Sequence, residues 1–420
     1  MKLKIYFFPL VIFILSTNNL DVNLNLWVEL LSENHPLIIN LKESLSENLN
    51  PIDLFAVFDL SGSMRGERLT KLKKALNLII DALDSNDRLG LISFENNARI
   101  LSDLSYMSDK EKIKQRNIVN KLIASGGTYF RQPIREFLNG IEKYYSPNNG
   151  RVQSVLFFTD GDSLDRIPPK YSFIKLYNKN YDFTVHTFLL GSEGNSKDLM
   201  EFANYRDGGF YFIEDSERIR DYVMNIIGGL RTTSYKNVNV NITSHYPIAK
   251  FYEYEKLSNT SYKENTSQSS FNILQFISGL EYTYVLELKL PENIKVGDNI
   301  LNVTVTYTDF NGNTYNVNNT INYDYGCIKC YRKEYCRIIE VEATEKAIQN
   351  INQSQVLFEE IKTKCGDDFD WNIYGVFFQF QMKPDMPYFY SSISEVALKR
   401  GGMNLWYLNF YQSKLIYIKK

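Results

Sequence analysis

Residues 52–63 read IDLFAVFDLSGS, an apolar run of strand length that ends in one carboxylate, Asp59, and two hydroxyls, Ser61 and Ser63. The continuous apolar run predicts a strand that is buried on both faces, as strands of a parallel sheet are. A carboxylate and hydroxyls on a tight turn supply only hard oxygen ligands, which suit Mg²⁺, Mn²⁺ or Ca²⁺. By itself the turn could instead cap a following helix, because Ser favours the N-cap position.

Two further loops with oxygen ligands follow along the chain. Residues 125–128 read SGGT, and a second apolar run at 155–158 (VLFF) ends in TDGD at 159–162. In an open parallel sheet, loops at the carboxyl ends of neighbouring strands converge on one crevice, so Asp59 and Asp160 are expected to meet there. The ordered set of three loops favours a metal site over three unrelated turns.

This set of loops resembles the metal-ion-dependent adhesion site of the von Willebrand factor A (VWA) family, whose pattern is D-x-S-x-S, then a Thr in a short Gly-containing loop, then an Asp after a later strand. The resemblance implies that a Mg²⁺ ion, or Mn²⁺ or Ca²⁺ in its place, is held by five residues: Asp59, Ser61, Ser63, Thr128 and Asp160. It also implies that a partner protein presents an Asp or Glu carboxylate to the ion. We expect the rim that contacts this partner to include Met64, Arg65, Tyr129 and Asp162.

The segment 51–231 alternates strand and helix patterns, which predicts an α/β domain with a doubly wound, mostly parallel, Rossmann-like sheet. Strands are expected at 52–58, 89–94, 153–159, 183–190 and 209–213, with 98–104 antiparallel to 89–94. Helices are expected at 69–83, 109–123, 132–145, 196–203 and 216–230, and Ser108 with Glu111 forms a capping box for the second of them. His186 lies in a strand with no second His nearby, so we interpret it as a packed or capped imidazole.

The flanking segments 18–50 and 232–325 have alternating, Thr-, Val- and Tyr-rich stretches and predict a β-sandwich into which the α/β domain is inserted, an arrangement also found in relatives of the VWA family. Strands are expected at 22–31, 36–43, 236–244, 282–290, 299–308 and 315–323, and Asn311-Gly312 indicates a hairpin. The remaining segment, 326–420, predicts a helix over 334–363 and then an aromatic-rich tail. This order is similar to plant and protist VWA proteins, some of which add a RING finger; this chain carries no RING pattern.

Residues 1–17 have two lysines, an apolar run from Ile5 to Leu15 and then small polar residues, the layout of a secretory signal peptide. The alternative for this run is a buried strand of the mature protein, and the alternative to secretion is a cytoplasmic location. No run approaches the roughly 20 apolar residues that a transmembrane helix needs. Secretion or cell-surface exposure would make six N-x-S/T sequons candidate glycosylation sites, at Asn241, Asn259, Asn265, Asn302, Asn318 and Asn352, although about five are expected by chance.

The four cysteines are Cys327, Cys330, Cys336 and Cys365. In a secreted chain an even number of cysteines favours disulfides, here two that tie the C-terminal region to the sandwich. A zinc site is the alternative, but the gaps after Cys330 and Cys336 do not have the spacing of a closed site.

Composition and charge exclude some classes of function. With 47 basic and 49 acidic residues the formal net charge is −2, which gives no electrostatic reason to expect nucleic-acid binding. None of the three histidines lies in the metal loops, and no Ser-His-Asp or Cys-His arrangement can be nominated. We therefore predict a protein-binding, adhesion-type module and not an enzyme. The alternatives are a metal-assisted hydrolase with Asp162 or Glu67 as general base, and an intracellular VWA scaffold of a ubiquitin-ligase-like or other complex.

Overall fold

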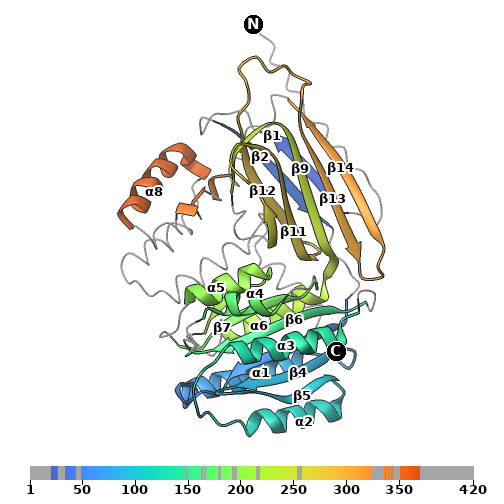
Figure 1. Cartoon of the computed structure of the whole chain (residues 1–420), viewed down its shortest axis with the longest axis vertical. Coiled ribbons are helices and arrows are strands. Elements are labelled where there is room, and N and C mark those ends of the chain that lie inside the picture. Colours follow the sequence, from blue (N-terminus) through green and yellow to red (C-terminus); the bar gives the residue numbers. More distant parts are fainter. Residues whose placement is uncertain are drawn as a thin grey trace.

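The computed structural model describes residues 20–26, 34–43, 49–146, 150–161, 164, 167–177, 181–191, 196–213, 218–252, 258–323, 335–337, 339–340, 342–343 and 351–368. These residues form a six-stranded sheet flanked by helices and an eight-stranded antiparallel sheet beside it (Figure 1). The predicted signal peptide and the aromatic-rich tail lie outside the described residues.

The six-stranded sheet has the predicted doubly wound topology. Its strands are β3 (Ile52–Asp59), β4 (Arg88–Phe94), β5 (Ala98–Tyr106), β6 (Val152–Thr159), β7 (Thr184–Leu189) and β8 (Phe210–Phe212), in the order β5-β4-β3-β6-β7-β8. Only β5 runs antiparallel to its neighbour, β4. The fold class and the antiparallel partner are thereby confirmed.

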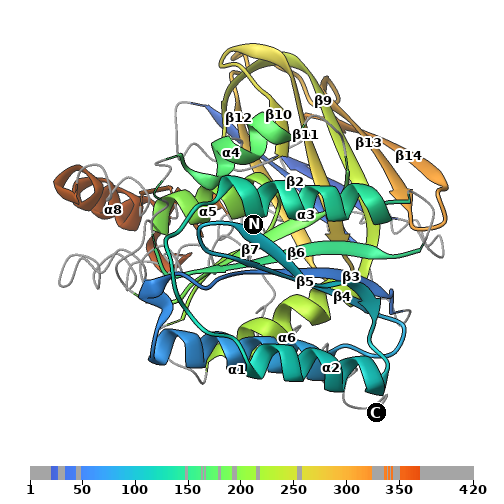
Figure 2. The same ribbon diagram turned by 60° about the horizontal axis from the view of Figure 1, so that its bottom comes forward.

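Helices cover both faces of this sheet (Figure 2). One face carries α1 (Glu67–Ala82), α2 (Asp109–Asn120) and α6 (Arg218–Arg231), and the other carries α3 (Arg131–Tyr144), α4 (Pro169–Leu176) and α5 (Ser196–Tyr205). Residues of β3 alternate between two cores, with Phe58 on the α1 side and Val57 on the α3 side. Every residue of β3 is buried, as the apolar run predicted. Ser108 caps α2, because its Oγ accepts the Glu111 N–H at 3.4 Å. The reciprocal half of the predicted capping box does not form, because the Ser108 N–H donates to the Tyr106 carbonyl at 2.9 Å.

A buried ion cluster ties three strands together at the amino-terminal edge of this sheet. The Asp53 carboxylate is fully buried in β3 and accepts hydrogen bonds from Arg88 Nε and Nη2, at 2.7 and 2.5 Å, and from Arg151 Nε at 2.6 Å. Arg88 begins β4 and Arg151 immediately precedes β6, so one carboxylate fixes both neighbours of β3 in register.

The second sheet is antiparallel and contains strands from both sides of the α/β unit. Its strands are β1 (Asp21–Leu26), β2 (His35–Lys42), β9 (Thr233–Phe251), β10 (Ser258–Ser261), β11 (Thr266–Ile277), β12 (Glu281–Leu288), β13 (Asn299–Asp309) and β14 (Thr314–Asn322). The long strand β9 pairs with β11 and β13 along its first part and with β12 at its end. The sheet therefore curls over an apolar core instead of dividing into two separate sheets. Strands β10 and β11 were not predicted.

The α/β unit is inserted between β2 and β9, because β2 pairs with β12 from the far side of that unit. The two connecting segments meet at the Asn50 N–H, which donates to the Arg231 carbonyl at 2.8 Å. Beside this junction, Gln275 Nε2 on β11 donates to the carbonyls of Gln153 and Asp182 at 2.7 Å each. The curled sheet thus packs against the amino-terminal edge of the parallel sheet.

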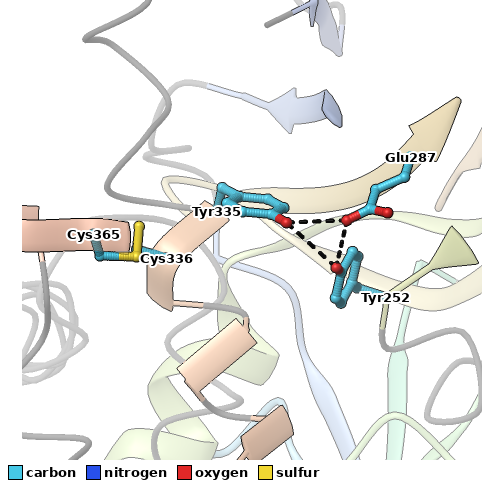
Figure 3. Close-up of a disulfide and its surroundings, with 5 residues drawn as sticks. All are labelled: Tyr252, Glu287, Tyr335, Cys336 and Cys365. Carbon is cyan, nitrogen blue, oxygen red and sulfur yellow. Dashed lines mark hydrogen bonds between the residues drawn. A yellow bond between two sulfur atoms is a disulfide. The ribbon is translucent and has the colours of Figure 1, made fainter. Parts of the chain in front are cut away.

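The C-terminal region contacts the curled sheet through a buried polar cluster, and a disulfide links two parts of this region to each other and not, as predicted, to the sandwich (Figure 3). Glu287 on β12 accepts hydrogen bonds from the hydroxyls of Tyr252 and Tyr335, at 2.6 and 3.0 Å. The next residue, Cys336, forms a disulfide with Cys365 at the end of α8 (Ile351–Cys365), which continues as η3 (Gly366–Asp368). Cys327 and Cys330 lie outside the described residues. Nowhere in the described chain is there a helix with the length and apolarity needed to cross a membrane.

His186 is capped, as its isolated position in a strand indicated. The Gly209 N–H donates to His186 Nδ1 at 3.1 Å, which holds the ring as a neutral imidazole. Burial lowers the pKa of His186 to about 3. The folded protein therefore excludes a proton that the unfolded chain accepts near pH 6.5.

We predict that replacing Asp53 with Asn destabilises the protein by about 3–5 kcal/mol, because it leaves two largely buried guanidinium groups without a carboxylate. Urea unfolding at neutral pH measures the change. The control is Asp103→Asn, which removes an exposed ion pair with Lys143 and is expected to cost under about 1 kcal/mol. Equal losses from the two substitutions would contradict the structural role of Asp53.

We also predict that the stability contributed by neutral His186 is present above about pH 6.5 and falls as the pH drops toward 3. Wild type should lose about 2 kcal/mol more stability between pH 7 and pH 5 than His186→Asn, whose amide oxygen can accept the same N–H without titrating. Urea unfolding at the two pH values tests this. His245→Asn is the control, because His245 is exposed on β9; a wild-type pH profile retained in His186→Asn would refute the prediction.

Candidate metal centre

The three predicted loops meet at the carboxyl ends of β3 and β6. The chain leaves β3 toward β4 on one side, whereas β6 lies on the other side, so the crevice between β3 and β6 is a topological switch point of the sheet. Asp59 is the last residue of β3, and Asp160 directly follows β6. The parallel register pairs Phe58 with Phe158, which places Asp160 one residue beyond the level of Asp59 at the same end of the sheet.

Asp59 is completely buried and held by hydrogen bonds on both carboxylate oxygens. The Ser61 N–H donates to Oδ1 at 2.7 Å, and the Thr159 hydroxyl donates to Oδ2 at 2.8 Å. Burial raises the pKa of the Asp59 carboxyl to about 7, and these hydrogen bonds offset that increase only in part. A cation bound beside Asp59 would stabilise the ionised form of this buried carboxylate.

A chain of hydrogen bonds links the remaining oxygen groups of two loops. The hydroxyls of Ser61 and Ser63, on either side of the first residue of η1 (Gly62–Met64), lie 3.0 Å apart. Ser63 Oγ then donates to Asp160 Oδ1 at 3.1 Å, although the two residues are 97 positions apart in the sequence. Four of the five predicted ligand residues are therefore gathered at one place.

The loop with Thr128 is joined to this cluster through the backbone. The Gly62 N–H donates to the Gly126 carbonyl at 2.9 Å, and the Ser125 N–H donates to the Leu60 carbonyl at 2.7 Å. Gly126 has a φ of +84°, a conformation that glycine adopts without strain. Thr128 itself is buried, with 7% of its surface exposed. The fifth predicted ligand thus lies in a loop fixed beside the other four.

These groups fit a hard divalent ion. The donors are carboxylate and hydroxyl oxygens, the ligand types that Mg²⁺, Mn²⁺ and Ca²⁺ accept. Both carboxylates are almost fully buried, with 0% and 2% of the Asp59 and Asp160 surfaces exposed. Among the described residues, no three His, Cys, Asp or Glu side chains are grouped to hold a metal, and the candidate cluster combines two acids with hydroxyls.

The predicted rim needs one correction. Met64 is fully buried in the core on the α1 side of the sheet, because the turn of η1 directs it inward, so it cannot contact a partner. Arg65 is exposed, and its Nε donates to the Ala124 carbonyl at 3.1 Å. Tyr129 is 37% exposed, and Leu164, whose N–H donates to the Thr128 carbonyl, is 60% exposed. Asp162 lies outside the described residues.

Two residues at the centre were missed from the sequence. Thr159 orients Asp59, and Arg68 Nη1 donates to Asp160 Oδ2 at 2.7 Å. Arg68 lies in the first turn of α1, where the helix dipole makes a positive charge unfavourable. An arginine at this position indicates that a nearby acid compensates its charge. By contrast Glu67, considered as a general base, forms an ion pair with Lys71 at 2.9 Å and is exposed.

Comparison with known proteins identifies the α/β unit. Residues 53–225 match the family model of the von Willebrand factor type A domain. The uncharacterized protein sll0103 of Synechocystis is 28% identical over 165 residues, covering 39% of this chain and 38% of that protein. The voltage-dependent calcium channel subunit alpha-2/delta-3 of Homo sapiens is 25% identical over 181 residues, covering 41% of this chain and 16% of that subunit. The chain thus spans well under half the length of these relatives.

Solved structures share the wider architecture. A von Willebrand factor type A protein from Catenulispora acidiphila aligns with a TM-score of 0.67 at 12% identity, over 92% of this chain and 97% of that one. The ArnB paralog VWA2 from Sulfolobus acidocaldarius aligns with a TM-score of 0.58 at 14% identity, over 90% and 97% of the two chains. At these identities the likeness concerns the fold. With the family match and the topology together, this chain contains a von Willebrand factor type A domain.

Proposed function

We propose that this VWA domain captures a partner protein through a Mg²⁺-type ion, held by Asp59, Ser61, Ser63, Thr128 and Asp160 and completed by an Asp or Glu carboxylate of the partner. VWA domains are typically protein-interaction or adhesion modules and often bind a divalent metal. The observation that carries the proposal is the hydrogen-bonded path from Ser61 through Ser63 to Asp160, which joins oxygen ligands from two distant loops.

The composition of the site favours capture of an anion. Only two of its five ligand residues carry a charge, so the protein neutralises the ion less than a site built from carboxylates alone. When bound, the ion supplies an electrophilic centre for an incoming carboxylate. The chain's own residues do the positioning: Thr159 orients Asp59, and the bond between Gly62 and Gly126 holds two ligand loops together.

The surface around the ligands suits contact with a protein. Tyr129 and Leu164 expose apolar side chains beside the Thr128 loop, and Arg65 adds an exposed cation to the η1 turn. Aromatic and Arg side chains are common anchors in protein interfaces. This rim would supply specificity, whereas the ion would supply a common attraction for carboxylates.

We propose further that the protein works outside the cell, at the surface or secreted, and that the chain is not an enzyme. Four of the predicted glycosylation residues, Asn241, Asn265, Asn318 and Asn352, are exposed, and Asn302 is half-buried. The side chain of Asn259 lies outside the described residues. The disulfide between Cys336 and Cys365 suits an oxidising compartment.

We predict that Ser63→Ala and Asp160→Asn each weaken Mg²⁺ and Mn²⁺ binding by at least about tenfold, because each removes one oxygen ligand or its charge. Isothermal titration measures the affinities. Ser125→Ala is the matched control, because its hydroxyl donates to Glu95 at 3.2 Å and not to a proposed ligand. If all three variants bind metal like wild type, the site assignment fails.

We predict that partner binding requires both the ion and its ligands. A partner recovered by wild type in Mg²⁺ should be lost in EDTA and lost with Thr128→Ala, and substitution of one partner Asp or Glu should also abolish the complex. Affinity capture followed by titration with the purified partner provides the measurement. Full retention in chelator would exclude capture through a metal bridge.

A further inference from the structure

Arg68 forms an ion pair with one of the proposed metal ligands, Asp160. Its Nη1 donates to Asp160 Oδ2 at 2.7 Å and to the Ser63 carbonyl at 3.3 Å. The Asp160 side chain is 1% exposed and the Arg68 side chain 24% exposed, so solvent screens this pair only in part. Arg68 was not expected from the resemblance to belong to the site.

The guanidinium occupies a defined slot. Gly191, which follows β7, has a φ of +125°, and a Cβ at this position would lie 2.7 Å from Arg68 Nε. The backbone at Gly191 therefore lies against the guanidinium of Arg68. Arg68 is held between the η1 turn and this glycine and cannot be regarded as a freely solvated side chain.

The two oxygens of Asp160 have different partners. Oδ1 accepts the Ser63 hydroxyl, within the chain of hydroxyls, and Oδ2 accepts Arg68. A cation that contacts the Ser63 hydroxyl would bind Oδ1 of Asp160, while Oδ2 keeps its hydrogen bond with Arg68. The arginine and a bound ion can therefore share one carboxylate.

The charges then determine what the site attracts. A divalent ion would balance the charges of Asp59 and Asp160, and Arg68 adds one positive charge beside them. Glu95, which accepts the Ser125 hydroxyl in the loop before Thr128, has its own partner in Arg99 at 2.7 Å. Compared with the same site without the arginine, a site with this added positive charge repels an incoming metal ion more strongly. Once the ion is bound, the added charge also attracts a carboxylate.

We propose that Arg68 sets the charge of the metal centre, weakening its affinity for the divalent ion and strengthening the ion's affinity for a carboxylate. This inference rests on the proposed metal-dependent function. In this role Arg68 is a positioning and charge-setting residue that acts through Asp160. Removal of Arg68 should increase the affinity for the divalent ion and decrease the affinity of the bound ion for a carboxylate. The loss of a merely structural contact would not change the two affinities in opposite directions.

The test compares Arg68→Gln with Arg68→Lys, which keeps the charge, and with Arg116→Gln. Arg116 lies on α2, where it pairs with Asp81 near the far end of α1, so this control removes the same net charge away from the site. Isothermal titration gives the affinity for Mg²⁺. Acetate serves as the carboxylate probe, and its binding to Mn²⁺-loaded protein is followed through the relaxation rate of water protons, which falls when acetate displaces bound water.

The expected result is that Arg68→Gln binds Mg²⁺ about tenfold more tightly and acetate at least about fivefold more weakly than wild type. Arg68→Lys and Arg116→Gln should stay within about threefold of wild type in both measurements. Tighter metal binding cannot arise from partial unfolding, because a disrupted site would bind metal more weakly.

Other outcomes overturn the inference. If wild type binds Mg²⁺ but Arg68→Gln binds it equally or more weakly, the role of Arg68 is wrong while the proposed function stands. Unchanged acetate affinity in Arg68→Gln also refutes the role. If wild type binds no Mg²⁺, both the proposed function and this inference fail.

Discussion

The parallel pairing of β3 with β6 is the constraint on which the candidate centre depends. This register places Phe58 beside Phe158, and the next residues of the two strands then connect through the bond from the Thr159 hydroxyl to the Asp59 carboxylate. A shift of the register by one residue would exchange the two faces of β6 and remove the Thr159 hydroxyl from its acceptor. The two cores on either side of the sheet oppose such a shift, because both faces of each strand are fully buried.

The single strand β3 carries a buried acid near each end, and the two acids are compensated differently. At the amino end, Asp53 is paired with Arg88 and Arg151. At the carboxyl end, Asp59 receives only hydrogen bonds from neutral groups, and burial raises its pKa. Burying a carboxylate without a cation is costly; the two arginines offset that cost at Asp53, whereas Asp59 has no cation partner among the described residues. This contrast within one strand supports a cation site independently of the motif.

Much of the α/β unit could be predicted from the sequence because its strands are continuous apolar runs and its helices have regular apolar spacing. The predictions were wrong or incomplete where contacts between distant residues determine burial, strand pairing or ion pairing. Met64 was assigned to the rim, but the η1 turn buries it in the core. The residues of β11 were missed since their apolar run lacks alternation, and their pairing with β9 comes from distant residues. Arg68 was missed because its acid partner lies 92 residues away in the sequence.

The placement of the curled sheet explains why the candidate centre lies where it does. Contacts from β11 reach the amino-terminal ends of β6 and β7, and the chain enters and leaves the α/β unit at that same edge, where Asn50 meets Arg231. The proposed metal ligands lie at the opposite end of β3. Because the junction and the proposed ligand loops share no described residue, the anchoring of the α/β unit and the proposed capture of a partner use separate ends of the same strands. Among the described residues, the Asp53 cluster and the Asp59 cluster are connected through the register of the strands. Substitutions at the junction should therefore change the free energy of unfolding and leave the proposed metal binding by the ligand loops unchanged.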